Sequence, residues 1–95
     1  MYSNEQEWEL YLQELKKIDM EGVRTYLVGH DWHPVESQYG PRAQVYRNQG
    51  EEAMLLLPVS AKLSDYYQRL AEALRIMARV EGIWYPYLVE RFIKQ

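Results

Sequence analysis

The chain has 95 residues, of which 47% are hydrophobic, and its 11 basic and 14 acidic side chains give a net charge of −3. This length predicts one domain, residues 1–95, because a second hydrophobic core would not fit. The absence of cysteine excludes disulfides, thiolate metal sites and cysteine nucleophiles, and the acidic balance makes binding to nucleic acid unlikely, since that needs clustered cations.

The first predicted element is an amphipathic helix from Asn4 to Ile18, within an N-terminal segment 1–18. Ser3 and Gln6 have the spacing of a capping box at its start. Apolar residues at intervals of three and four form one face: Trp8, Tyr11, Leu12, Leu15 and Ile18. Carboxylates occupy the other face: Glu5, Glu7, Glu9 and Glu14. We interpret them as a solvated face, with mimicry of nucleic-acid phosphates as the alternative.

A second helix is predicted from Met20 to Val28. Asp19 precedes it as an N-cap, and Gly29 stands near its end as a stop. Gly22 favours a break between the two helices over one bent helix, because an interior glycine costs about 1 kcal/mol relative to alanine.

Three strands follow, separated by glycine-containing turns. The segment from Trp32 to Glu36 is predicted as an edge strand, because Pro34 cannot donate to a ladder. Alternation from Arg42 to Arg47 predicts a half-buried strand. The segment from Glu52 to Leu57 is apolar on both faces, so we expect it in the centre of the sheet, with Pro58 ending it.

A long helix is predicted from Asp65 to Glu81, with Ser64 as N-cap and Gly82 as stop. The aromatic tail, residues 83–95, contains a short helix that starts at Pro86, where a missing N–H costs nothing. The expected fold is therefore of the α+β class: a three-stranded antiparallel sheet, the long C-terminal helix packed on one face, and an extra N-terminal helix.

From residue 19 to 82 the order is helix, three strands, helix, punctuated by the Gly40 turn and Pro58. This order resembles the α-β-β-β-α layout of HicA-type toxins and of double-stranded-RNA-binding domains. In HicA-type mRNA interferases the second strand opens with Gly-Ser-His, and that histidine is catalytic. Here Gly40, Pro41 and Arg42 hold the matching positions. The resemblance therefore implies the fold but not the ribonuclease activity.

Residues typical of metal or catalytic sites are few. His30 and His33, with Glu36 nearby, have a spacing that does not force ligands to converge on one point. We interpret them as surface histidines, with metal-dependent catalysis, or His33 as a general base, as the alternatives. No phosphate-binding loop or serine nucleophile motif is present. We predict no cofactor, no metal and no enzymatic activity.

The composition is unusual in its aromatic residues: nine Tyr and three Trp against one Phe. Rings with a polar handle suit protein interfaces as well as the rim of a small core. The apolar run from Ile83 to Tyr87 either packs back on the first helix or covers a partner. The predicted partner-binding residues are Trp8, Tyr11, Trp84, Tyr85 and Tyr87.

The function predicted from these features is that of a small protein-binding module. It would be an inhibitor, adaptor or antitoxin-like protein of bacterial or mobile-element origin, bound to another protein or to a second copy. The alternative is a degenerate HicA-like domain that binds or cleaves RNA through Arg42, Arg47 and Arg79, although acidic neighbours dilute this basic set. The longest apolar stretch, Ala53 to Leu57, is too short for a bilayer, so we expect a soluble protein without membrane contact. The absence of cysteine favours a cytoplasmic location.

Overall fold

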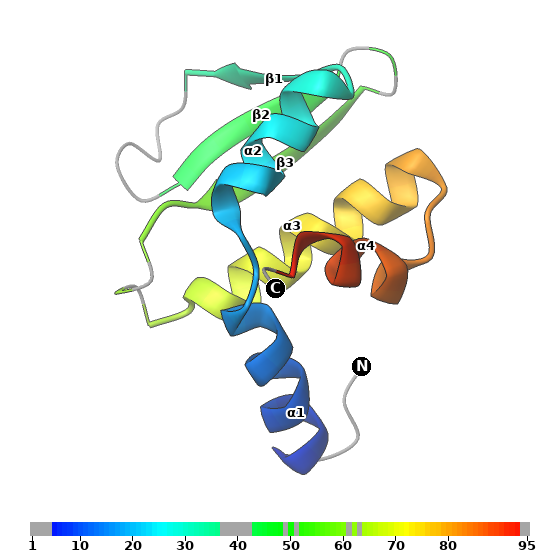
Figure 1. Ribbon diagram of the computed structural model, residues 1–95. Helices are drawn as coiled ribbons and strands as arrows, with labels where there is room; N and C mark the ends of the chain where they lie inside the picture. The colour runs from blue at the N-terminus through cyan, green and yellow to red at the C-terminus, as the bar shows by residue number, and fades with distance from the viewer. Residues whose placement is uncertain are drawn as a thin grey trace.

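The computed structural model describes residues 5–36, 43–48, 50, 52–60, 62 and 64–93, with the side chains of the first four of these left out. Its elements are α1 (Glu5–Lys16), α2 (Met20–Gly29), β1 (Trp32–Val35), β2 (Ala43–Asn48), β3 (Ala53–Pro58), α3 (Tyr66–Glu81) and α4 (Tyr85–Phe92). The predicted α+β class is confirmed (Figure 1). The predicted Ser3 capping box and the Gly40 to Arg42 motif lie outside the described residues.

The three strands form one antiparallel sheet in the order β1-β2-β3. The prediction that β1 is an edge strand is confirmed, and Pro34 therefore lies where a missing N–H is tolerated. The prediction that the third strand is central is wrong, because β2 lies between the other two.

The error has a physical cause in the outer face of the sheet. Val35, Val45 and Leu56 are directly opposite one another across the three strands. They form an apolar row on the face turned away from the core cluster, and Val45 in the middle of the row is buried. β3 is apolar on both faces because it contributes to this row as well as to the core. An edge strand can therefore be apolar on both faces.

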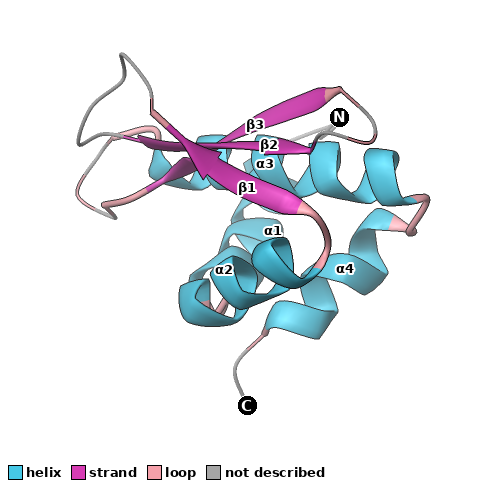
Figure 2. Ribbon diagram, turned by 90° about the horizontal axis from the view of Figure 1, so that it is seen from above, coloured by secondary structure: helices cyan, strands magenta, loops and turns pink. Residues whose placement is uncertain are grey.

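The core lies between the inner face of the sheet and the helices, which Figures 1 and 2 show gathered on one side of it. Leu55 and Leu57 of β3 are fully buried in the same cluster as Leu70, Leu74 and Met77 of α3. These α3 residues recur at intervals of three and four, so they form one stripe along the helix. Burying each such side chain contributes about 1.5–3 kcal/mol.

Helix ends lie close to where the sequence predicts them. Asp19 caps α2, and its carboxylate accepts the Glu21 N–H at 3.2 Å. Gly82 ends α3 in the left-handed conformation with φ 68°, which glycine adopts without strain. α3 begins after Asp65, one residue later than the predicted Ser64 cap, and the Asp65 carboxylate accepts from Arg69 Nε at 3.0 Å.

The segment that follows α1 meets the end of α4. The Asp19 N–H donates to the Phe92 carbonyl at 2.8 Å, and Ile18 and Ile93 form an isolated antiparallel bridge. α1 and α4 both pack on α3 as well. Within the described ranges, no helix combines the length and the apolar character needed to cross a membrane.

Candidate functional site

The aromatic residues predicted to bind a partner fall into two groups in the structure. Trp84 and Tyr87 are exposed, at 76% and 60% of their possible surface. Tyr11 and Tyr85 are half-buried. The side chain of Trp8 lies outside the described part of the chain. The sequence left two alternatives for the tail. Packing back on α1 applies to Tyr85, whereas Trp84 and Tyr87 remain available to a partner.

Tyr85 is the residue that packs back. Its ring lies 5.9 Å from the ring of Tyr11, centroid to centroid, at an interplanar angle of 52°. The guanidinium of Arg75 lies 5.4 Å from the Tyr85 centroid, within the range of a cation–π contact. Tyr85 thus joins the start of α4 to α1 and α3, and its first role is to position α4.

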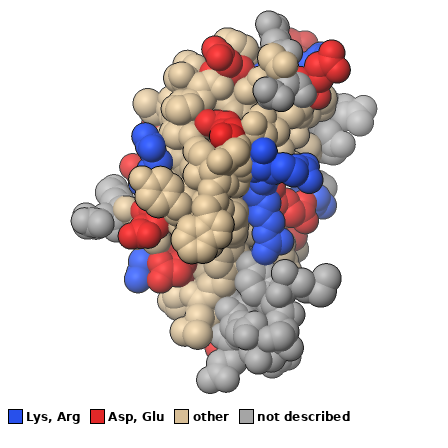
Figure 3. Space-filling view, turned by 90° about the vertical axis from the view of Figure 1, so that its right-hand side faces the viewer, with Lys and Arg blue, Asp and Glu red and all other residues tan. Residues whose placement is uncertain are grey.

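Trp84, the N-cap of α4, is followed at intervals of three and four residues by Tyr87 and Arg91, so the three lie along one side of the helix. Leu88 and Phe92 are buried on the inner side of the same helix, which fixes its orientation. In Figure 3, which views the molecule from the right-hand side of Figure 1, uncharged side chains form a continuous strip between charged groups. We call the set Trp84, Tyr87 and Arg91 the aromatic stripe.

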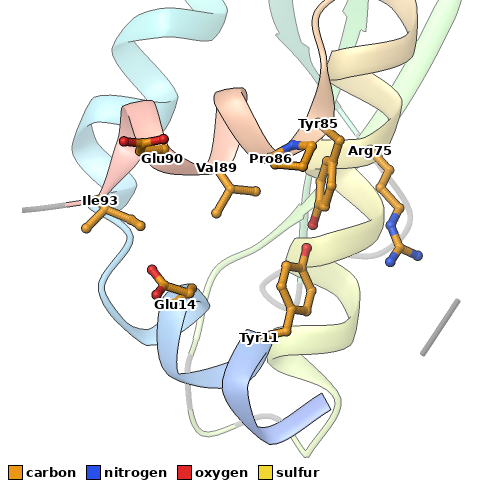
Figure 4. Close-up of a pocket in the computed structure, with 8 residues that line it drawn as sticks. All are labelled: Tyr11, Glu14, Arg75, Tyr85, Pro86, Val89, Glu90 and Ile93. Atoms are coloured by element: carbon orange, nitrogen blue, oxygen red, sulfur yellow. The ribbon is translucent and has the colours of Figure 1, made fainter. Parts of the chain in front are cut away.

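A cleft of about 700 Å³ opens on the other flank of α4, facing α1. Its lining consists of Tyr11, Glu14, Arg75, Tyr85, Pro86, Val89, Glu90 and Ile93 (Figure 4). Apolar atoms make up most of this lining, while carboxylates from both helices border it. Glu14, predicted to lie on a solvated face of α1, is exposed and borders this cleft.

A polar cluster centred on Glu81 joins α2, β1 and the end of α3. The Glu81 carboxylate accepts from the Tyr26 hydroxyl at 2.7 Å and from Trp32 Nε1 at 3.2 Å. It also lies 3.0 Å from His30 Nδ1. The His30 ring stacks on Tyr26 at 3.8 Å between centroids, with an interplanar angle of 13°.

This cluster alters the acidity of Tyr26. Burial, followed by the hydrogen bond to Glu81, raises the pKa of Tyr26 to about 12. Burial also raises the pKa of Tyr66, on the first turn of α3. The role of Glu81 was missed from the sequence, because its partners Tyr26 and Trp32 are 55 and 49 residues away along the chain.

The two histidines do not form one site. His30 bonds to Glu81 at the end of α2, whereas His33 is exposed on the outer face of the sheet, opposite Arg47 of β2. Across the described residues, no three His, Asp or Glu side chains converge in a way that could hold a metal ion.

Comparison of the chain with protein-family models, with curated proteins and with solved structures found no match. The observed order α2-β1-β2-β3-α3 agrees with the α-β-β-β-α order from which the HicA resemblance was inferred. Agreement in order is a property of many small folds. The relationship to HicA-type toxins therefore stays a prediction.

The arginines proposed to contact RNA are not brought together. Arg47 is exposed on the outer face of the sheet, because its neighbours Tyr46 and Asn48 point into the protein. Arg79 is exposed on α3, which packs against the inner face. Arg42 lies outside the described residues. The two described arginines thus lie on different sides of the sheet.

Proposed function

We propose that this protein is a non-enzymatic binding module that attaches to a protein partner through the aromatic stripe of α4. The observation that carries the proposal is the exposure of Trp84, the N-cap of α4, and of Tyr87 in its first turn, on a helix whose inner side is buried. An inhibitor, adaptor or antitoxin-like role in the cytoplasm fits such a module.

Trp and Tyr are the residues in which interface binding energy concentrates, because each ring buries about 150–250 Å² and keeps one polar contact. Such rings contribute more to affinity when they project from a rigid helix, because little conformational entropy is then lost on binding. Leu88 and Phe92 supply that rigidity by burying the inner side of α4. Arg91, whose guanidinium lies 5.1 Å from the centroid of the Tyr26 ring, adds to the stripe a cation of the type enriched at interfaces.

The proposal that catalysis is absent is supported by how Glu81 and His30 are used. Among the residues that the structure describes, they are the pair that most resembles an acid–base dyad, since the carboxylate lies 3.0 Å from Nδ1. The same carboxylate holds the Tyr26 hydroxyl and the Trp32 indole, which are parts of the core. This arrangement favours a structural role for Glu81.

The alternative of an RNA-binding or RNase domain has less support. Binding of duplex RNA would need Arg47 and Arg79 on one surface to follow the phosphates across a minor groove. The separation of these two residues by the sheet argues against such a surface.

The experiment is a comparison of proteins retained from a host lysate by three immobilised baits: the wild type, the double variant Trp84→Ala/Tyr87→Ala, and Val28→Ala. Val28 is as exposed as Tyr87 but lies on α2, so its variant is a matched control for the loss of exposed apolar surface. We expect proteins that the wild type and the control retain and the double variant loses. Equal retention by all three baits would refute the proposal.

A further inference from the structure

The cleft between α1 and α4 is closed at two points and open between them. At one end the rings of Tyr11 and Tyr85 meet at 5.9 Å between centroids. At the other end the Asp19 N–H bonds to the Phe92 carbonyl at 2.8 Å, beside the bridge of Ile18 and Ile93. These two closures hold the helices apart at a set distance. The intervening volume, about 700 Å³, lies within the range of about 300–1,000 Å³ that is typical of small-molecule sites.

Most of the lining surface is apolar. Val89 and Ile93 point into the cleft from α4 and from the residue that follows it, and Pro86 and the two tyrosine rings extend this surface (Figure 4). A ligand that enters the cleft can therefore bury an apolar body against side chains that are already fixed, because Val89 is only 5% exposed and Tyr85 is held by Tyr11 and Arg75.

The charge of the cleft is negative at one end. Figure 4 shows the carboxylates of Glu14 and Glu90 on the side of Ile93, one from each helix. The Arg75 guanidinium lies beyond the Tyr85 ring, away from both carboxylates. Within the described part of the chain, neither glutamate takes part in a salt bridge. The end near Ile93 thus attracts a cation and repels an anion.

We propose that this cleft binds a small organic cation. Its apolar body lies on Val89, Ile93 and the tyrosine rings, and its ammonium group lies between the Glu14 and Glu90 carboxylates. A metal ion is a poor match, because hard cations such as Ca²⁺ require about six to eight oxygen ligands. The ring faces that border the cleft add a further attraction for an organic cation. The inference does not rest on the protein-binding proposal, which concerns the other flank of α4.

The test compares three ligands of one shape and different charge: phenylbutylamine, phenylbutanol and phenylbutanoate. Binding to the full chain is followed by the shifts of backbone amide signals in two-dimensional NMR. We expect saturable shifts in α1 and α4 with the amine, at least about tenfold weaker binding of the alcohol, and no saturation with the carboxylate.

Variants of the two lining glutamates test whether their carboxylates account for the preference for the amine. Glu14→Gln and Glu90→Gln should each weaken amine binding by about 1.5-fold to fivefold, as expected for exposed ion pairs, and leave alcohol binding unchanged. Glu9→Gln is the matched control: it removes an exposed carboxylate of α1 that does not line the cleft, so it should leave both ligands unaffected. Both lining glutamates are exposed, so their variants should give the spectrum of the folded protein.

Several results would overturn the proposal. Equal binding of amine and alcohol would show that the positive charge of the ligand contributes nothing to binding. Equal effects of the control and lining variants would show that Glu14 and Glu90 do not contact the ligand. Shifts confined to Trp84 and Tyr87 would place the ligand elsewhere. Tighter binding of a blocked Gly-Lys-Gly peptide than of the amine would identify a lysine of a protein as the occupant.

Discussion

Removal of the Glu81 carboxylate should destabilise the protein more than any other single loss of charge on α3. In Glu81→Ala the Tyr26 hydroxyl and the Trp32 indole N–H lose their acceptor, and both residues are buried. Each of the two buried donors left without a partner costs about 1–3 kcal/mol, so the free energy of unfolding should fall by about 2–6 kcal/mol. His30 adds little, because its side chain is 44% exposed and water can replace the carboxylate.

Glu81→Gln should cost less, about 1–3 kcal/mol, because the amide keeps one accepting oxygen and turns its NH₂ toward a donor. The matched control is Glu72→Ala, which removes an exposed carboxylate of α3 that lies 3.8 Å from Arg69. It should change stability by no more than about 0.5 kcal/mol. Urea unfolding followed by circular dichroism measures all three variants. A value for Glu81→Ala within about 0.5 kcal/mol of the control would refute the reasoning.

Three further predictions test other parts of the structure. Gly82→Ala should lower the free energy of unfolding by about 1–2 kcal/mol, because φ is 68° there, whereas Gly29→Ala at the end of α2 should be neutral or slightly stabilising. The pKa of Tyr26 is about 12 in the folded protein against an ordinary 10.0, so the unfolded chain loses this proton first as the pH rises. The contribution of Tyr26 to the free energy of unfolding should therefore be fully present below pH 10 and be lost from pH 10 to 12. Tyr26→Phe should reduce the slope of stability against pH in this range, measured from unfolding curves. Tyr85→Ala should lower stability by about 1–3 kcal/mol and Trp84→Ala by no more than about 0.5 kcal/mol in the same urea assay, and a reversed order would contradict their assigned packing.

The elements of the fold were predictable wherever one residue determines the local backbone. Asp19 can accept an N–H at a helix start, Gly82 can take positive φ, and Pro86 suits the first turn of a helix. Each is found in the predicted role, because such preferences depend on neighbours within a few residues.

Strand order was less predictable because it depends on what covers each face. The apolar character of Leu55, Leu56 and Leu57 indicated a strand covered on both sides. The structure places Leu55 and Leu57 in the core and Leu56 in the outer row with Val35 and Val45. A continuous apolar run shows that both faces of a strand are apolar, but it does not show whether the strand is paired on one edge or on both.

For the site residues too, local features were predictable and contacts between distant segments were not. Aromatic enrichment directed attention to the tail, but sequence spacing could not separate exposed Trp84 and Tyr87 from half-buried Tyr85. That separation depends on where Tyr11 lies after folding. The Glu81 cluster and the cleft likewise arise from contacts between distant segments, which no local pattern encodes.

The central claim is that the aromatic stripe binds a protein partner, and the dissociation constant of the purified partner retained by the wild-type bait tests it most directly. Calorimetric titration should give a loss of at least about 2 kcal/mol, or roughly thirtyfold, for each of Trp84→Ala and Tyr87→Ala, the size typical of interface hot spots. Val28→Ala should bind as the wild type does. An unchanged dissociation constant for both aromatic variants would contradict the claim.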